Sequence, residues 1–164
     1  MMATRATFIY AYPLDRLLHA LKYNAQLAYA DYFAAALADS VDRWPDVMAP
    51  IPLAPARQRE RGFNQSEEIA KRLSRRSGVP VVAGLVRTRD TPAQASLPWQ
   101  ARAGNARGVF AGLPLLAGQR VAIVDDVMTT GSTMAAAAKA ALRAGATHIE
   151  AWVVARTLPP AQSP

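Results

Sequence analysis

The chain has 164 residues, of which 51% are hydrophobic and 19% are charged, a balance typical of one globular domain with a core of its own. It contains no cysteine, which excludes disulfides and thiolate metal sites, and no apolar run long enough to span a bilayer. The net charge of +7 favours polyanionic partners, either a pyrophosphate or a nucleic acid. Because residues 1–15 lack a secretory apolar segment and a cleavage site, we expect a cytoplasmic protein with no membrane contact.

Apolar periodicity predicts that helices alternate with short strands along the chain. Leucines recur at helical spacing after Pro13, a residue that suits a first helical turn. The predicted elements are helices over 13–22 and 26–40, a strand over 47–53, a helix over 65–77, strands over 79–83, 108–111 and 119–126, a helix over 133–144 and a strand over 147–155. Strands that alternate with helices imply an α/β fold, an open, mostly parallel twisted sheet with helices on both faces.

Residues 88–107 show no clean period and contain Pro92 and Pro98, so we expect a long loop with room for one helical turn. A loop of about twenty residues inside a compact domain usually has a function, such as that of a lid. We set the flexible lid at 87–108 within a core over 46–157, and we expect a disordered tail over 158–164.

Residues 121–134, VAIVDDVMTTGSTM, place two acids after a short apolar run, and a hydroxyl-rich loop before an alanine-rich helix. The run predicts a strand buried on both faces, and ligands of open α/β sheets bind beyond the carboxyl ends of such strands. The adjacent carboxylates of Asp125 and Asp126 repel each other, so a buried pair needs a cation or donors such as ribose hydroxyls. The loop Thr129–Thr133 offers N–H groups at a helix start, which favours phosphate. The segment therefore predicts a site for a ligand that carries both hydroxyls and a phosphate.

Other interpretations of this segment are weaker. An acidic strand end followed by a Ser/Thr-capped helix is common, but it does not explain the acid pair and Gly131 together. The spacing of a P-loop lysine and that of a Rossmann GxGxxG turn are both absent.

Residues 57–65, RQRERGFNQ, form a second motif between a proline-bounded strand and a helix. Arg57, Arg59 and Arg61 have the planar guanidinium that suits bidentate phosphate contacts. A solvated basic run is the alternative for these three arginines. In the segment 71–76 that follows, Lys71, Arg72, Arg75 and Arg76 are expected to form mostly a solvated face. Asn64 or Ser66 is expected to cap the helix.

The segment VAIVDDVMTTGST resembles the phosphoribosyl-pyrophosphate (PRPP) signature of type I phosphoribosyltransferases. The resemblance implies that Asp125 and Asp126 contact the ribose hydroxyls and that the following loop cradles the 5′-phosphate. The residues implied for ribose and 5′-phosphate binding are Asp125, Asp126, Val127, Met128, Thr129, Thr130, Gly131, Ser132 and Thr133.

The chain as a whole resembles the ComF/GntX-like competence-associated branch of that family, over about residues 14–156. The matching pieces are Leu21-Lys22-Tyr23, Pro52 with Arg57, RGFNQ at 61–65, Thr91, Gln94, Leu97, Arg102 and Asn105, and 125–133. Family members usually begin with a four-cysteine zinc segment, which this chain lacks, so no zinc is expected in it.

The resemblance implies Mg²⁺-dependent displacement of pyrophosphate from C1 of PRPP by a nitrogen nucleophile. Asp125, Asp126 and Arg57 would be catalytic, and Arg57, Arg59 and Arg61 would bind the pyrophosphate. The lid residues implied are Arg87, Thr91, Gln94, Arg102 and Asn105. Residues 1–45 would form a helical hood over the acceptor, and nothing in them indicates which base it is.

Two alternatives remain open at this stage. The protein could be a non-catalytic component of DNA uptake that binds single-stranded DNA by its basic surface and retains the sugar-phosphate pocket. It could also be a PRPP-sensing regulator without turnover. PRPP or ribose 5-phosphate, DNA-uptake proteins and a second copy of the chain are the partners that these hypotheses imply.

Overall fold

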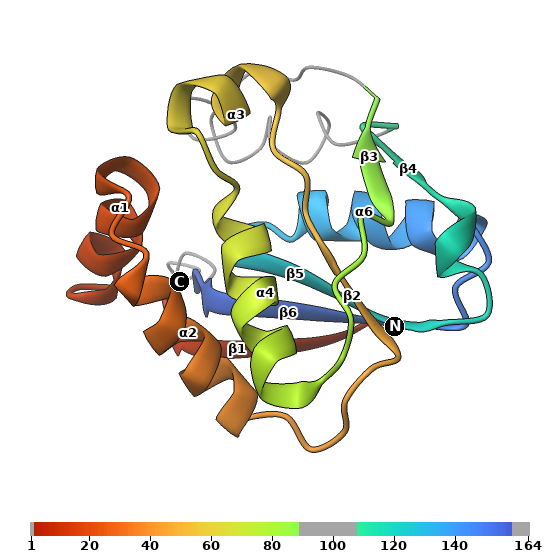
Figure 1. The fold of residues 1–164 in the computed structure, drawn as a ribbon, viewed down its shortest axis with the longest axis horizontal. Coiled ribbons are helices and arrows are strands. Elements are labelled where there is room, and N and C mark those ends of the chain that lie inside the picture. The colour runs from red at the N-terminus through yellow and green to blue at the C-terminus, as the bar shows by residue number, and fades with distance from the viewer. Residues whose placement is uncertain (1, 89–107, 159–164) are drawn as a thin grey trace, which may run out of the picture.

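The computed structural model describes residues 2–88 and 108–158, which form a parallel sheet between two layers of helices (Figure 1). Its elements in chain order are β1 (Ala3–Ile9), α1 (Leu14–Asn24), α2 (Ala28–Asp39), β2 (Val47–Pro50), α3 (Pro55–Arg61), α4 (Gln65–Ser77), β3 (Leu85–Arg87), β4 (Phe110–Gly112), the 3-10 turn Pro114–Leu116, β5 (Arg120–Met128), α6 (Ser132–Arg143) and β6 (His148–Arg156). The main sheet has the order β1-β6-β5-β2, and all its neighbours are parallel. The predicted α/β class is confirmed.

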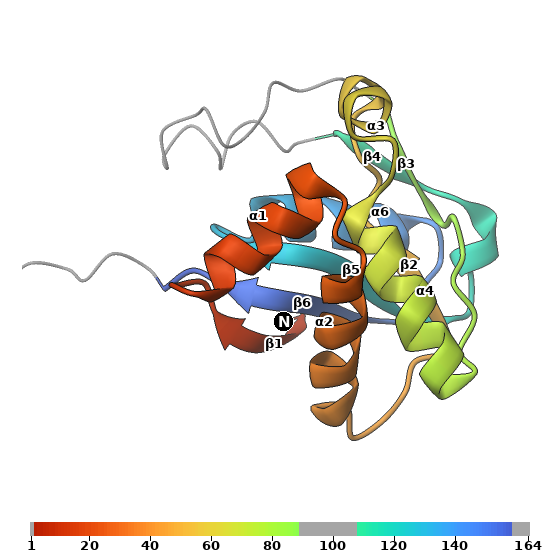
Figure 2. The ribbon, with the colours of Figure 1, turned by 60° about the vertical axis from the view of Figure 1, so that its left-hand side comes forward.

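Helices cover both faces of this sheet, with α2 and α4 on one side and α6 on the other (Figures 1 and 2). Along β5 the buried side chains alternate accordingly. Val121 and Ile123 belong to the cluster around α6, while Ala122 and Val124 belong to the cluster around α1, α2 and α4. A strand that is buried on both faces has a continuous run of apolar residues, which is why VAIV could be recognised as such a strand in the sequence.

The helix α4 has the bounds that the sequence predicted, because its start and end are both encoded locally. Asn64 caps it by accepting the Ser66 N–H on its side-chain oxygen at 3.0 Å. At the other end Gly78 adopts a φ of 75°, a left-handed conformation that ends helices and that glycine adopts without steric cost.

Three predictions of secondary structure were wrong. Residues 1–45 are not purely helical, because β1 pairs with β6 from Ala3↔Glu150 to Ile9↔Arg156 and is an edge strand of the main sheet. Residues 79–83 make only a single parallel bridge, Val81 to Met48. The 108–111 strand begins at Phe110 instead and joins a separate antiparallel pair, β3-β4.

The arginines of the RQRERGFNQ motif lie on a short helix, α3, that was not among the predicted elements. Pro55 stands in the first turn of α3, where its missing N–H costs nothing, and Gly62 ends the helix with a φ of 78°.

No helix within residues 2–88 or 108–158 is both long enough and apolar enough to cross a membrane.

Candidate functional site

Asp125 and Asp126 lie near the carboxyl end of β5, at the edge of the sheet where the sequence placed a ligand. The helix α1 lies near this edge (Figures 1 and 2), and its residue Lys22 contacts Asp126. The edge is completed by the start of α4 and by the loop that enters α6.

Asp125 is held by neutral donors. Its Oδ1 accepts the Ser66 hydroxyl at 2.8 Å and the Asp126 backbone N–H at 2.9 Å. Ser66 is itself fixed by Asn64, whose amide nitrogen donates to the Ile51 carbonyl at 2.9 Å. Burial, followed by the negative charge of Asp126, raises the pKa of Asp125 to about 7, against the opposing effect of these hydrogen bonds.

Asp126 is held by a cation. It is 4% exposed, and its Oδ2 lies 2.5 Å from the Nζ of Lys22 on α1. Burial alone would raise the pKa of Asp126, but the charge of Lys22 and its hydrogen bond outweigh burial, so the pKa is lowered. The pKa of Lys22 is raised for the matching reason, since the attraction of Asp126 exceeds the effect of burial.

The loop after β5 curls around a small hollow in front of α6. Gly131, with a φ of 76°, precedes the helix, and the Thr130 and Ser132 hydroxyl oxygens lie 2.9 Å apart. The hollow measures about 30 Å³ and is lined by Val127 to Met134. A cavity needs only ~10–15 Å³ to hold a water molecule, so this one has room for a small polar group at the helix start.

The arginines of α3 are divided between two sides of the helix. Arg57 and Arg61 are half-buried and four residues apart, which places them on one face, while Arg59 is exposed. Arg61 donates from Nη1 to the Gln65 Oε1 at 2.6 Å, and its guanidinium lies 5.2 Å from the centre of the Tyr23 ring. A cavity of about 170 Å³ is lined by Lys22, Tyr23, Ala25, Glu60, Arg61 and Phe63. Arg61 therefore lies beside the cation of the acid pair, and Arg59 does not share its face.

Comparison with known proteins identifies the family. Residues 31–161 match the phosphoribosyl transferase domain family. The DNA utilization protein YhgH of Escherichia coli K12 is 35% identical over 158 residues, which cover 91% of this chain and 70% of that protein. Competence protein F of Haemophilus influenzae is 35% identical over 117 residues, which cover 68% of this chain and 51% of the relative. The chain belongs to the phosphoribosyltransferase domain family, in its ComF-type branch.

Solved structures agree with this assignment at the level of the fold. A glutamine PRPP amidotransferase from B. subtilis superposes with a TM-score of 0.55 at 23% identity, covering 76% of this chain and 25% of that chain. An allosteric regulatory enzyme of purine biosynthesis gives a TM-score of 0.51 at 22% identity, with the same coverage. At these identities the likeness shows that the fold is shared.

One of the residues predicted for the lid, Arg87, lies within the described part of the chain. Arg87 belongs to β3, where its Nε donates to the Pro52 carbonyl at 3.4 Å and its guanidinium lies 5.1 Å from the Phe110 ring centre. Thr88 and Gly108 are joined by a hydrogen bond of 2.8 Å from the threonine hydroxyl to the glycine carbonyl. Both ends of the segment are thus anchored. The other predicted lid residues, Thr91, Gln94, Arg102 and Asn105, lie outside the described residues, as does the tail from 159 to 164.

The segment 71–76 is not a uniformly solvated face. Arg72 is 9% exposed, and its Nη1 lies 2.7 Å from Glu68 Oε2 while its Nε lies 3.0 Å from Asp31 Oδ1. Its guanidinium therefore links α4 to α2, and we assign Arg72 a structural role. Arg75 and Arg76 are exposed, as predicted.

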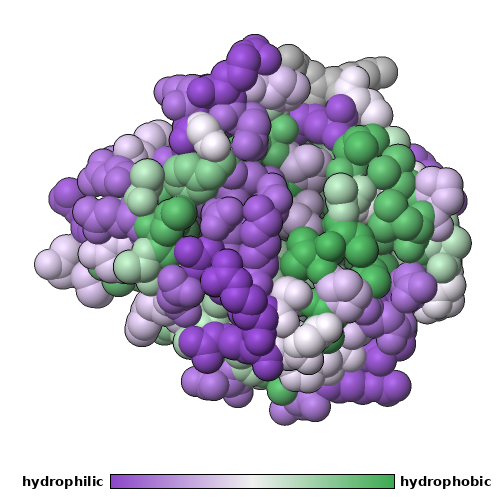
Figure 3. All heavy atoms as spheres, viewed as in Figure 1, coloured by the Kyte–Doolittle hydropathy of each residue, from purple (hydrophilic) through white to green (hydrophobic). Residues whose placement is uncertain are grey.

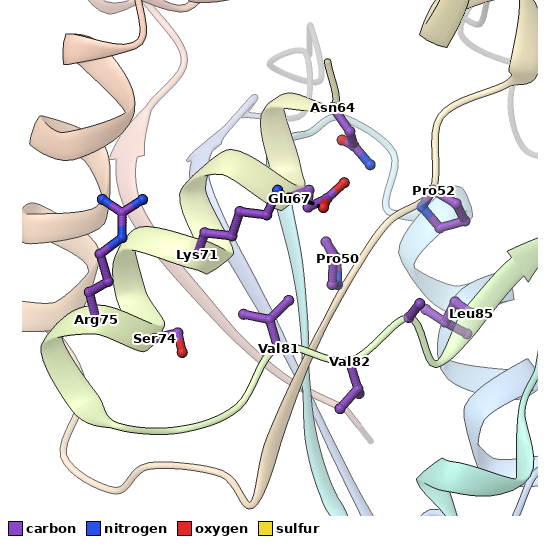
Figure 4. Close-up of a pocket in the computed structure, with 11 residues that line it drawn as sticks. Pro50, Pro52, Asn64, Glu67, Lys71, Ser74, Arg75, Val81, Val82 and Leu85 are labelled. Carbon is purple, nitrogen blue, oxygen red and sulfur yellow. Dashed lines mark ion pairs between the residues drawn. The ribbon is translucent and has the colours of Figure 1, made fainter. Parts of the chain in front are cut away.

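A cavity of about 590 Å³ is a groove between α4 and residues 81–85, and no predicted ligand-binding residue lines it (Figure 4). In Figure 3 apolar side chains gather beside the polar band over α4. Along the wall Lys71 Nζ lies 2.8 Å from Glu67 Oε1. The acid pair and the hydroxyl-rich loop lie elsewhere, at the carboxyl end of β5.

Sequence reasoning missed the roles of two residues in this site. Lys22 was seen only as part of the Leu21-Lys22-Tyr23 element, and Ser66 only as a cap candidate. A basic residue near the end of an otherwise leucine-lined helix was the signal for Lys22, but its partner is distant in sequence.

A dedicated metal cage is not present among residues 2–88 and 108–158, where no three His, Cys, Asp or Glu side chains are grouped to hold a metal ion. Mg²⁺ needs no such cage when it arrives with phosphates, because one or two carboxylates then suffice. The half-buried carboxylate of Asp125 fits that requirement.

Proposed function

We propose that the chain binds PRPP with Mg²⁺ and transfers its phosphoribosyl group to a nitrogen acceptor. One observation carries the proposal: the hydroxyl-rich loop directly follows β5, the strand that carries the acid pair, so both lie at the same edge of the sheet. The acid pair would accept the ribose hydroxyls, and the start of α6 would receive the 5′-phosphate. Membership of the phosphoribosyltransferase domain family supports this arrangement.

In the transfer step the nitrogen lone pair forms a bond to C1 while the bond from C1 to the pyrophosphate oxygen breaks. Both electrons of that bond leave with the pyrophosphate, and the acceptor nitrogen loses a proton. Arg61, with Arg57 on the same face of α3, would stabilise the negative charge that develops on the leaving group. Bound Mg²⁺, held by the pyrophosphate and the Asp125 carboxylate, would neutralise part of the same charge.

A second function is favoured by the names of the relatives and by the charge. Curated relatives of this chain are called DNA utilization protein and competence protein, and the chain carries a net charge of +7. We propose a role in DNA uptake, with weak binding of single-stranded DNA by a basic surface that includes Arg75 and Arg76.

Incubation of the protein with PRPP, Mg²⁺ and a panel of purine and pyrimidine bases tests the first proposal. If pyrophosphate is released only when one particular base is present, the result supports a phosphoribosyltransferase activity. Binding of PRPP without release by any base supports a protein that retains the pocket for binding or regulation. Absence of PRPP binding contradicts the proposal.

A further inference from the structure

The two edges of the main sheet differ in how they are covered. Beyond β2 the sheet is continued by residues 80–82, because the Val82 N–H donates to the Met48 carbonyl and the Met48 N–H donates to the Pro80 carbonyl, both at 2.9 Å. The other edge is β1, a strand of seven residues that lies at the rim of the sheet (Figure 2). Within the described parts of the chain, no strand pairs with the outer side of β1.

The backbone groups on that outer side belong to alternate residues of β1. The Tyr10 N–H donates to the Arg156 carbonyl of β6 at 2.9 Å, and the register between β1 and β6 does not change along the strand. Successive residues of a strand direct their N–H and C=O groups to opposite sides, so every second residue before Tyr10 faces β6 and the others face outward. The outward residues are Ala3, Arg5, Thr7 and Ile9.

This edge lacks the features that keep an edge strand unpaired. Such strands are usually short, or protected by a proline, a bulge or a charged side chain. β1 has no proline and no break in its register, and its one charged residue is Arg5. The Arg5 guanidinium is held inside its own copy, with Nη1 3.1 Å from Asp42 Oδ2 and Nε 3.2 Å from Glu150 Oε2. At the end of the strand, Ile9 and Tyr10 are exposed apolar side chains.

The sequence of β1 fits a second copy of itself in one antiparallel register. A two-fold axis makes the same strand of both copies antiparallel. An axis at Arg5 would set two arginines directly opposite each other, which is destabilising. An axis at Thr7 would leave Ala3 and Thr4 beyond the strand of the second copy. An axis at Ala6 avoids both problems and pairs all seven residues. The pairs between the copies are then Ala3 with Ile9, Thr4 with Phe8, Arg5 with Thr7, and Ala6 with Ala6.

These pairs match in size and in backbone direction. The exposed Ile9 of one copy lies beside the small Ala3 of the other, and Thr4 with Phe8 is a pair of a β-branched and an aromatic side chain, which is favourable across strands. Each outward residue meets an outward residue of the second copy, so their N–H and C=O groups are satisfied together.

We propose that two copies of the chain associate through β1 about a two-fold axis at Ala6, and that their four-stranded sheets become one continuous sheet. Because the paired strands are antiparallel, the carboxyl ends of the two sheets point in opposite directions. The two acid pairs therefore lie at opposite ends of the dimer, and neither site takes residues from the other copy. The proposal does not depend on the proposed function.

Sedimentation equilibrium of the intact chain tests the association. The wild type should have twice the 17.6 kDa mass of one chain. Thr7→Pro removes an outward N–H that the fold of one copy does not use, a position where an edge strand tolerates proline, and should sediment as a folded monomer. Thr7→Ala is the matched control, because it loses the same side chain but keeps the N–H, and should remain a dimer. A monomeric wild type, or a folded Thr7→Pro variant that remains dimeric, overturns the proposal.

The register is tested by cysteine cross-linking, which also decides the matter if Thr7→Pro does not fold. The chain has no cysteine, so each variant carries a single thiol. Opposite residues of a non-hydrogen-bonded antiparallel pair have Cα atoms about 4.5 Å apart, which a disulfide can span, so oxidised Ala6→Cys should run as a covalent dimer. Thr4→Cys is equally exposed, but its two copies would be roughly 14 Å apart along the strands, and it should not cross-link. Any other pattern of cross-linking overturns this register.

Discussion

The hydroxyl of Ser66 donates to Oδ1 of Asp125 at 2.8 Å, and this bond joins two motifs that lie 59 residues apart in the sequence. Ser66 follows directly after RGFNQ, and Asp125 opens the acid pair. The short distance places the first turn of α4, which directly follows the arginine-rich segment, beside the acid pair.

Ser66→Ala should weaken that site without unfolding the protein. A hydrogen bond to a carboxylate is worth about 1.5–3 kcal/mol, and the half-buried Asp125 would lose one of its donors. We expect lower ribose 5-phosphate affinity by calorimetry and a lower unfolding free energy in urea. Ser74→Ala, at the far end of the same helix, is the matched control and should change neither quantity by more than about 0.5 kcal/mol. Equal effects of the two substitutions would contradict the role of Ser66.

The stability of the protein should depend on pH through Asp125. Its pKa is raised to about 7 in the folded protein, well above the usual value of an aspartate, so the folded state binds more protons than the unfolded state between about pH 4 and 7. The unfolding free energy should therefore fall as the pH rises through this window, by at most ~1.4 kcal/mol per pH unit. Urea unfolding of wild type and Asp125→Asn at pH 4.5, 5.5, 6.5 and 7.5 measures the difference between the two, in which other titrating groups cancel. A difference that does not change with pH would refute the raised pKa.

The packing of α2 on α4 should depend on Arg72. Arg72→Met removes the contacts with Asp31 and Glu68 while keeping an apolar stem, and we expect a loss of about 1–3 kcal/mol in unfolding free energy. Arg75→Met is the control, because that side chain is exposed, and should cost less than about 0.5 kcal/mol. If both substitutions have equally small effects on the unfolding free energy, Arg72 does not stabilise the packing of α2 on α4.

The loop before α6 should bind an oxyanion even in the absence of a sugar. Its hollow of about 30 Å³ lies at the start of the helix, where the helix dipole favours negative charge. Crystals grown in sulfate should show the ion within hydrogen-bonding distance of Gly131 or Ser132. Gly131→Ala, which forces a side chain into a φ of 76°, should reduce the occupancy. If crystals of the wild type grown at molar sulfate show no sulfate at this loop, the prediction of an anion site is contradicted.

The sequence indicated those parts of the fold whose signals are local. The strand β5 was found because an apolar run precedes Asp125. The helix α4 was found because its start and end are set by adjacent residues, the cap Asn64 and the glycine that follows the helix. The strand β1 was missed because it is an edge strand, with an exposure pattern that follows no clean alternation. The helix α3 was missed because a charged seven-residue segment has no apolar face to detect.

The site was predictable only in part, for the same reason. The acids and the loop are consecutive in sequence and carry a recognisable pattern. The partners of the acids are not local, since Lys22 and Ser66 reach β5 only through the tertiary fold. The prediction that Arg72 is solvated was wrong for the same reason. Its partner Asp31 lies on α2, and the sequence of α4 alone does not indicate that contact.

Single-stranded DNA should bind to a surface separate from the acid pair. Arg75 and Arg76 are exposed in the last turn of α4, whereas Asp125 lies beside the first turn. Each phosphate neutralised on a single strand lowers log K by about 0.7 per decade of salt, so Arg75→Glu/Arg76→Glu should reduce both the affinity and the salt slope. The measurement is fluorescence anisotropy of a labelled oligonucleotide from low to physiological salt.

The matched control for that variant is Lys139→Glu/Arg143→Glu, which makes the same change in net charge on α6, across the sheet. It should lower DNA affinity less, because only the long-range field of the protein is altered. Ribose 5-phosphate binding should be unchanged in both double variants. Equal losses in the two would mean that net charge alone attracts DNA. Displacement of the oligonucleotide by stoichiometric PRPP would instead place the DNA at the mouth of the pocket, near Arg61, and contradict separate sites.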